Sequence, residues 1–261
     1  MAMLSGVTIR TALVLALVGI VLGRSDLALA QARTLREAMV GSAAADGRAR
    51  PSAPPAGHYV SESGDRFIFD RSGRTALLQF DSGLEIWALR PTPGPRGDII
   101  YKNDLDQPVV RTTPLGGLTV FTLENPEGMP AAFTSAARPF RPPVLTPAHV
   151  LGILTKSSER ASRAARRVIS FEAGVRGQEV TPQSAYLVAD AAGITAEAIS
   201  RLALTQRGRV ALTRVLKVKI LYGPRPAVRL SGGVLEVIVT PKYGMAGRPS
   251  SGVIMRVIGA R

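Results

Sequence analysis

Apolar and polar residues alternate in six short runs between Tyr59 and Leu123, and each run stops at a cluster of Gly, Asp, Asn or Pro. Such alternation places successive side chains on opposite faces of a strand, and the residues at the breaks suit tight turns. The pattern predicts an antiparallel β-meander over residues 58–123, either a curled sheet or a small barrel. The expected strands are Arg66–Asp70, Arg74–Phe80, Leu84–Leu89, Asp98–Lys102, Pro108–Thr112 and Leu118–Thr122.

Trp87 is the only tryptophan of the chain and lies on the third expected strand, just before a Pro- and Gly-rich turn over residues 91–98. A tryptophan on a central strand is usually the core anchor of a small sheet, and this is the interpretation we favour. The alternative is that its aromatic face lines a groove that binds a sugar or a lipid.

The second half of the chain has helical periodicity followed by strands. Thr146 and Pro147 form a helix-start signal, and apolar residues recur at helical spacing from Val150 to Ile169. Further helices are expected from Thr181 or Ser184 to Ala192, over Thr195–Ala203 and over Gln206–Leu212, and strands over Val215–Tyr222, Ala227–Leu230 and Gly233–Thr240. Residues 252–259 are expected to form a strand or a short helix. The predicted class is α+β, with the β-meander followed by a helical segment packed on a small C-terminal sheet.

The ends and the middle of the chain predict how it is divided. Residues 1–30 resemble a secretory signal peptide, with an apolar run after Arg10 and a small-x-small cleavage site ending at Ala30. We expect residues 31–57 to be a disordered tether, 124–147 a Pro-rich strap, and 148–261 the α+β region. The predicted location is the periplasm, after cleavage near Ala30.

The chain is strongly basic and has no cysteine. Its formal net charge is +14 over 261 residues, and removal of residues 1–30 leaves 31 basic and 18 acidic residues, or +13. The arginine-rich usage indicates either the mutational bias of a GC-rich genome or attraction to an anionic partner. The absence of cysteine excludes disulfides, thiolate nucleophiles and a lipoprotein anchor cysteine.

Motifs that carry chemistry are missing from the sequence. It contains no nucleophile elbow, phosphate loop, dinucleotide fingerprint or zinc-protease helix motif, so we predict no cofactor and no metal. Residues 103–107 carry oxygen ligands at alternate positions but lack the bend glycine and the closing glutamate of a calcium loop. A hairpin turn in which Asn and Asp bond their own backbone is the preferred interpretation.

The most distinctive candidate site is a basic helix face in the second half. It consists of Lys156, Arg160, Arg163, Arg166 and Arg167. Four of these residues share one face at i, i+4, i+7 and i+11 spacing, which suits contact with anionic headgroups. The competing interpretation is the solvated side of an amphipathic helix that packs on a core.

Three stretches resemble a known group of sequences. They are Trp87–Pro91 with Gly94–Asp98, Leu115–Gly117 with Thr119, and Gly247–Ser251. They are similar to an uncharacterised family of exported alphaproteobacterial proteins, a domain of unknown function, over roughly Tyr59 to the C-terminus. The resemblance implies location and lineage but provides no catalytic residues.

These observations favour a non-catalytic, exported protein of the cell envelope that binds anionic lipid or lipopolysaccharide through the basic helix face. We expect no nucleic-acid partner. One alternative is a hydrolase of envelope polymers that uses a carboxylate pair drawn from Glu85, Asp98, Asp104 and Asp106. Another is a protein-partner module in which the strap or a sheet edge receives a second chain.

Overall fold

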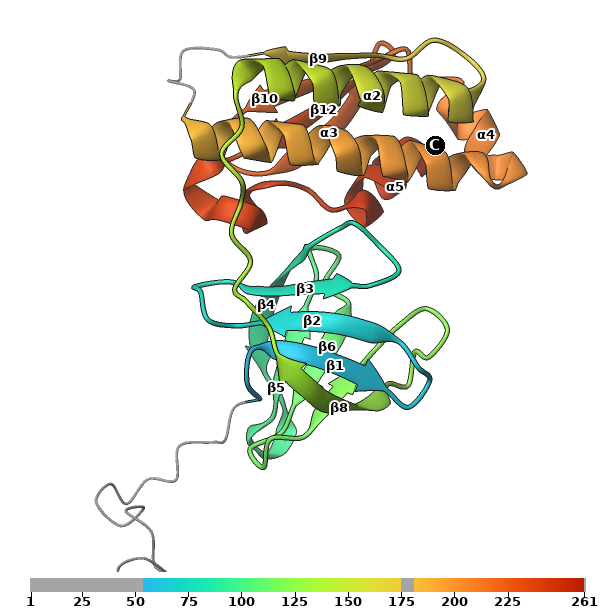
Figure 1. Ribbon diagram of the computed structural model, residues 1–261. Helices are drawn as coiled ribbons and strands as arrows, with labels where there is room; N and C mark the ends of the chain where they lie inside the picture. Colours follow the sequence, from blue (N-terminus) through green and yellow to red (C-terminus); the bar gives the residue numbers. More distant parts are fainter. Residues whose placement is uncertain (1–53, 175–180, 261) are drawn as a thin grey trace, which may run out of the picture. The chain divides into compact units, whose positions relative to one another are not determined.

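The structure, a computed structural model, describes residues 54–174 and 181–260 (Figure 1). The predicted leader and residues 31–53 of the predicted tether lie outside the described residues.

Eight antiparallel strands close into a barrel in chain order, because β1 pairs with β8 as well as with β2. The strands are β1 (Gly57–Ser61), β2 (Arg66–Asp70), β3 (Ala76–Phe80), β4 (Trp87–Pro93), β5 (Ile99–Lys102), β6 (Pro108–Thr112), β7 (Leu118–Val120) and β8 (Met129–Ala136), with a single 3-10 turn, η2 (Pro95–Gly97), between β4 and β5. The predicted meander is therefore confirmed, and of its two forms the closed barrel is the one observed.

Alternating side chains of the strands fill the barrel. Phe67, Phe69, Leu78, Leu89 and Val110 are almost fully buried. The rings of Phe69 and Tyr101 meet edge to face with centroids 5.1 Å apart, a favoured aromatic geometry. Trp87 is only partly buried at the margin of this cluster, so the prediction that it anchors the core is wrong.

The predicted strand Leu84–Leu89 is displaced along the chain. The observed β4 begins at Trp87 and continues through Pro91 and Pro93, which were expected to form a turn. It pairs with β3 over residues 87–89 and with β5 over residues 90–93. The prolines thus lie where β4 has one partner strand, and there a missing backbone N–H is tolerated.

The predicted Pro-rich strap, residues 124–147, contains the strand β8, and the predicted tether ends inside β1. Most side chains of β8 are exposed, so its sequence lacks the alternation that marks a strand. Pairing with both β1 and β7 holds it in the barrel instead. Strand formation here depends on closure, which is a long-range property.

The α+β half contains a four-stranded sheet with the order β11-β12-β10-β9. Its elements are α2 (Pro147–Ala165), β9 (Ser170–Gly174), α3 (Pro182–Ala203), α4 (Gln206–Leu212), β10 (Lys217–Tyr222), β11 (Ala227–Ser231), β12 (Val234–Val239), η3 (Pro241–Gly247) and α5 (Ser251–Gly259). Strand β10 runs parallel to both β9 and β12, whereas β11 and β12 form an antiparallel hairpin. Gly232 and Gly233 both have positive φ in the hairpin turn, as a two-residue turn of this kind requires.

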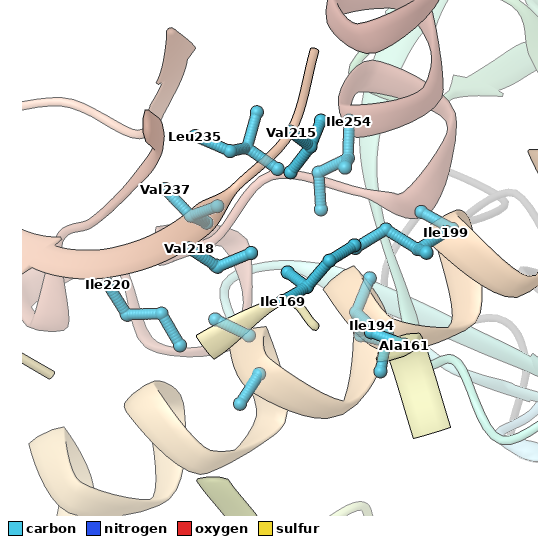
Figure 2. Close-up of a cluster of buried hydrophobic side chains, with 14 of the residues drawn as sticks. Ala161, Ile169, Ile194, Ile199, Val215, Val218, Ile220, Leu235, Val237 and Ile254 are labelled. Atoms are coloured by element: carbon cyan, nitrogen blue, oxygen red, sulfur yellow. The ribbon is translucent and has the colours of Figure 1, made fainter. Parts of the chain in front are cut away.

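One face of the sheet packs against the helices. Figure 2 shows Ile169, Val218, Ile220 and Val237 gathered with residues of the helices α2, α3 and α5. The buried set from the helices includes Ala161, Ile194, Ile199 and Ile254. This single core confirms the predicted α+β packing.

Three predictions for this half need correction. The helices expected on either side of residues 193–194 are one helix, α3, in which the Thr195 hydroxyl donates to the Ala191 carbonyl at 2.7 Å. Helix α2 ends at Ala165 rather than Ile169, because Arg166 adopts a left-handed conformation (φ 53°), and the residues beyond it enter β9. Residues 251–259 form the helix α5, which settles the alternative left open by the sequence.

Candidate anion-binding surface

The five residues of the predicted basic face lie along the outer side of α2 and just beyond its end. Lys156, Arg160, Arg163 and Arg166 are exposed, and Arg167 is half-buried. Arg160 pairs with Glu197 of α3, and Arg167 donates to the backbone carbonyl of Thr213. Two of the five therefore fasten α2 to its neighbours, while Lys156, Arg163 and Arg166 make no side-chain hydrogen bond or ion pair within residues 54–174 and 181–260.

The end of α2 meets segments from later in the chain. The contact from Arg167 to Thr213 brings it beside the α4–β10 connection, and Arg214 donates to the carbonyls of Ile258 and Ala260 at 2.5 Å each. Figure 1 shows α4 and the C-terminal ends of α2 and α3 at the same end of the α+β half. Basic residues that are far apart in the sequence therefore gather here.

Large apolar side chains are exposed in the same segments of the chain as these arginines. The exposed fractions are 83% for Val168, 80% for Leu204, 61% for Val210 and 51% for Leu216. Exposed apolar residues interleaved with arginines are characteristic of surfaces that contact a membrane interface. We call this region the basic surface, and it comprises Lys156, Arg160, Arg163, Arg166, Arg167, Val168, Leu204, Arg207, Arg209, Val210, Arg214 and Leu216.

Acidic residues are scarce around the basic surface, where Glu159 of α2 is exposed next to Arg160. Residues 160–171 and 198–235 contain no Asp or Glu. Glu197 is half-buried between Arg160 and Arg201, and Lys217 lies 2.7 Å from Glu172. The hydrogen bond from Lys217 is the largest influence on the Glu172 carboxyl and lowers its pKa. No acidic residue lies near Arg207 and Arg209 of α4 in the sequence, since residues 198–235 contain no Asp or Glu.

The positive charge of the protein is concentrated in one half. Residues 57–136, which form the barrel, hold seven basic and ten acidic residues, a net charge of −3. Residues 147–260 hold 17 basic and six acidic residues, a net charge of +11. A genomic bias acts on the whole gene, so this asymmetry favours a functional origin for the charge.

The four carboxylates of the hydrolase alternative each have a structural partner. Asp98 is buried and lies 2.5 Å from Arg111, and Asp106 lies 2.5 Å from Arg90. Asp104 accepts from the backbone N–H and hydroxyl of Ser250, and Glu85 accepts from the same groups of Ser251. These contacts favour structural roles for all four.

Glu85 and Asp104 come from two barrel loops and converge on the N-terminus of α5. Ser250 is its N-cap, and its hydroxyl accepts from Val253 N–H. Negative groups are favourable at a helix N-terminus because the first N–H groups have no partner within the helix. These contacts attach the barrel to the α+β half, and the described residues of both belong to one compact unit.

Arg248 lies at the centre of the same junction, and its side chain is 2% exposed. Its guanidinium group pairs with Asp190 of α3, lies 3.6 Å from Glu85, and donates to the Ile86 carbonyl at 2.7 Å. Burial, with a further contribution from Asp190, raises the pKa of the neighbouring Tyr186 to about 12. Asp190, Glu85 and Ile86 are distant from Arg248 in sequence, so the only signal near this network was the stretch Gly247–Ser251, which carries part of the resemblance to the uncharacterised family.

A further carboxylate fixes the segment that follows β8 to the barrel. Asp70 accepts from the Ser72 hydroxyl at 2.7 Å and from Phe140 N–H at 2.9 Å. Burial alone raises the pKa of Asp70, but the hydrogen bonds from Ser72 and Phe140 outweigh it and leave the pKa below its usual value. The ionised carboxylate is therefore a stabilising part of the fold.

The turn at residues 103–107 has the structure expected for a hairpin. Asn103 Oδ1 accepts from the N–H groups of Leu105 and Gln107, both at 3.0 Å, which confirms the preferred interpretation. Within residues 54–174 and 181–260, no cluster of three or more His, Asp or Glu residues is suited to a metal ion. In that same part of the chain, no helix has the length and apolar character required to cross a bilayer.

Comparison with known proteins assigns a family but no activity. The profile of a family described as "Domain of unknown function (DUF4908)" matches residues 34–258. No curated protein and no solved structure matches the chain. The resemblance to an uncharacterised family is thus confirmed, whereas the exported location and the alphaproteobacterial lineage that it implied stay predictions.

Proposed function

Since the chain belongs to the DUF4908 family, a domain of unknown function, we propose that it is an exported, non-catalytic protein of the alphaproteobacterial cell envelope that binds an anionic lipid surface. The basic surface is the binding site in this proposal. Phospholipid headgroups and lipopolysaccharide share the phosphate chemistry that it would recognise.

The observation that carries the proposal is the mixture of exposed arginines and exposed apolar side chains at one end of the α+β half. Each Arg or Lys close to an anionic membrane contributes roughly 1 kcal/mol of binding free energy. Val168, Leu204, Val210 and Leu216 add apolar area that can enter the headgroup region. Stable attachment needs two such signals, and the basic surface has both.

The proposal also depends on the barrel, which lacks the positive charge of the α+β half. The barrel is net negative, so an anionic membrane repels it weakly while attracting the α+β half. This asymmetry would orient the protein with the basic surface toward the lipid. The predicted leader, residues 1–30, is the basis for placing this contact in the envelope.

The direct test reverses three charges that have no hydrogen-bond or ion-pair partner among the described residues. We expect the variant Lys156→Glu, Arg163→Glu, Arg166→Glu to bind vesicles of phosphatidylglycerol and phosphatidylcholine at least about tenfold more weakly than the native chain. The melting temperature should hardly change, because within the described ranges these side chains make no hydrogen bond or ion pair. Co-sedimentation with the vesicles measures the binding.

A matched variant separates the surface from net charge. Arg66, Arg96 and Arg225 are exposed and lie outside the basic surface, so their replacement by glutamate changes the net charge equally. We expect this control to lose less than about threefold in affinity, since charges beyond a Debye length are screened. Equal losses in the two variants, or no loss in either, would refute the assignment of the basic surface.

A further inference from the structure

A cleft of about 1160 Å³ lies between the barrel and the α+β half. Strands β4 and β5 and the loop after β5 form one wall, and the ends of α3 and α5 form the other. Its volume is slightly above the usual range for small-molecule sites, roughly 300–1000 Å³. The cleft shares no residue with the basic surface.

The lining combines an apolar floor with cationic side chains. Trp87, Leu105, Leu123, Leu202 and Met255 provide apolar surface. The cationic residues are Arg74, Arg90, Lys102, Arg201, Arg248 and Arg256. Two acidic residues line the cleft, and both are engaged: Asp104 with Ser250, and Asp106 with Arg90.

Most of the cations are neutralised by the protein itself, but two are not. Arg90 and Lys102 contact Asp106, Arg201 pairs with Glu197, and Arg248 belongs to the buried network. In the part of the chain that the structure describes, Arg74 and Arg256 make no side-chain hydrogen bond or ion pair. They come from opposite walls, Arg74 from the barrel and Arg256 from α5.

The walls are held in place before any ligand arrives. Asp104 and Glu85 bind the first residues of α5, and Arg248 binds the Ile86 carbonyl next to Trp87. A preformed site avoids the entropic cost of ordering loops around a ligand. A second hollow of about 370 Å³ shares Leu202 and Arg256 with the cleft, so an apolar body has room to extend toward α4.

We propose that this cleft binds a small amphiphile with one acidic head group, a carboxylate or a phosphate, and an apolar body. The guanidinium groups of Arg74 and Arg256 hold the acid, since arginine binds both groups through paired charge-assisted hydrogen bonds. Trp87, Leu202 and Met255 contact the apolar part. This binding is separate from attachment to a lipid surface and uses different residues.

The only tryptophan of the chain is a built-in probe of this site. The experiment titrates the full chain with dodecanoate and with dodecyl phosphate, each below its critical micelle concentration, and records Trp87 fluorescence and the heat of binding. Saturable binding of either anion is the expected result, and dodecanol and dodecyltrimethylammonium should not bind. Binding of dodecanoate alone would assign a carboxylate ligand, and binding of dodecyl phosphate alone a phosphate ligand.

Arg74→Ala and Arg256→Ala should each weaken binding of the anion about tenfold, the effect of one lost charge-assisted hydrogen bond. The exposed Arg96, outside the cleft, provides the matched control, and Arg96→Ala should bind as the native chain does. Unaltered melting temperatures would show that the variants are folded.

The proposal is overturned if neither anion gives a change in fluorescence or heat, if dodecanol binds as tightly as dodecanoate, or if both arginine variants retain native affinity. Arg74→Ala should leave vesicle retention intact. The cleft and the basic surface can therefore fail independently.

Discussion

Replacing Arg248 with methionine is expected to lower the free energy of unfolding by about 3–5 kcal/mol, as for other buried ion pairs that lose one partner. The guanidinium group faces two carboxylates, Asp190 and Glu85, and one carbonyl, Ile86. Methionine fills a similar volume but removes the donor to Asp190 and to the Ile86 carbonyl, and removes the positive charge that faces Glu85. The loss therefore comes from uncompensated buried charge rather than from a cavity.

Urea unfolding measures this change, with circular dichroism for the helices and Trp87 fluorescence for the barrel. Arg229→Met is the matched control, because Arg229 is exposed on β11 and such surface substitutions stay within about 0.5 kcal/mol. A change below about 1 kcal/mol for Arg248→Met would contradict the role assigned to the buried network.

Replacing Phe69 with alanine is expected to lower the free energy of unfolding by about 3–5 kcal/mol through loss of buried apolar area and the cavity left behind. Phe69 is fully buried in the barrel and packs on the ring of Tyr101. In a closed barrel every strand is hydrogen-bonded to two neighbours. The strands therefore cannot move inward far enough to fill the cavity that the Phe69 ring leaves.

Trp87 fluorescence during urea unfolding reports this loss directly, because Trp87 packs against the same cluster as Phe69. Leu115→Ala is the control, since Leu115 is 94% exposed and its loss should be nearly neutral. If Phe69→Ala proved as mild as Leu115→Ala, the barrel core described above would be wrong.

The sequence predicted the elements whose signals are local. Strands β2 and β6 have the predicted bounds, and the Thr146–Pro147 signal marks the start of α2. The strands β11 and β12 were predicted over Ala227–Leu230 and Gly233–Thr240, within one residue of each observed bound. In each case, alternation, a cap or a turn residue lies within a few positions of the element.

The missed elements depend on partners far along the chain. Strand β8 has mostly exposed side chains and exists because β1 and β7 lie on either side of it. Strand β9 is only five residues long, and the predicted helical pattern continued past the end of α2 to Ile169, directly before this strand. Trp87 was expected in the core but is only partly buried. Alternation of apolar and polar residues indicates which face of a strand a side chain is on, but not how deeply it is buried.

The candidate site was predicted only in part, because some of its features are local and others depend on contacts between distant parts of the chain. Helical spacing placed Lys156 and Arg163 on an exposed side of α2, as observed, whereas Arg166 is exposed just beyond the end of that helix. Helical spacing could not show that Arg160 forms an ion pair with Glu197, or that Arg167 donates a hydrogen bond to the α4–β10 connection. The contribution of α4 and the network around Arg248 require the folded chain.

The central claim is that an exported protein attaches to an anionic envelope surface through charge, and one fractionation tests it most directly. Full-length protein with a C-terminal tag is expressed in a Gram-negative bacterium, and the membranes are washed at high salt before N-terminal sequencing. The account predicts a chain beginning at Gln31 that pellets with membranes and is released by the wash, since about 1 M salt shortens the Debye length to about 3 Å. A mature chain found wholly in the soluble fraction, or an uncleaved chain that resists the wash, would contradict it.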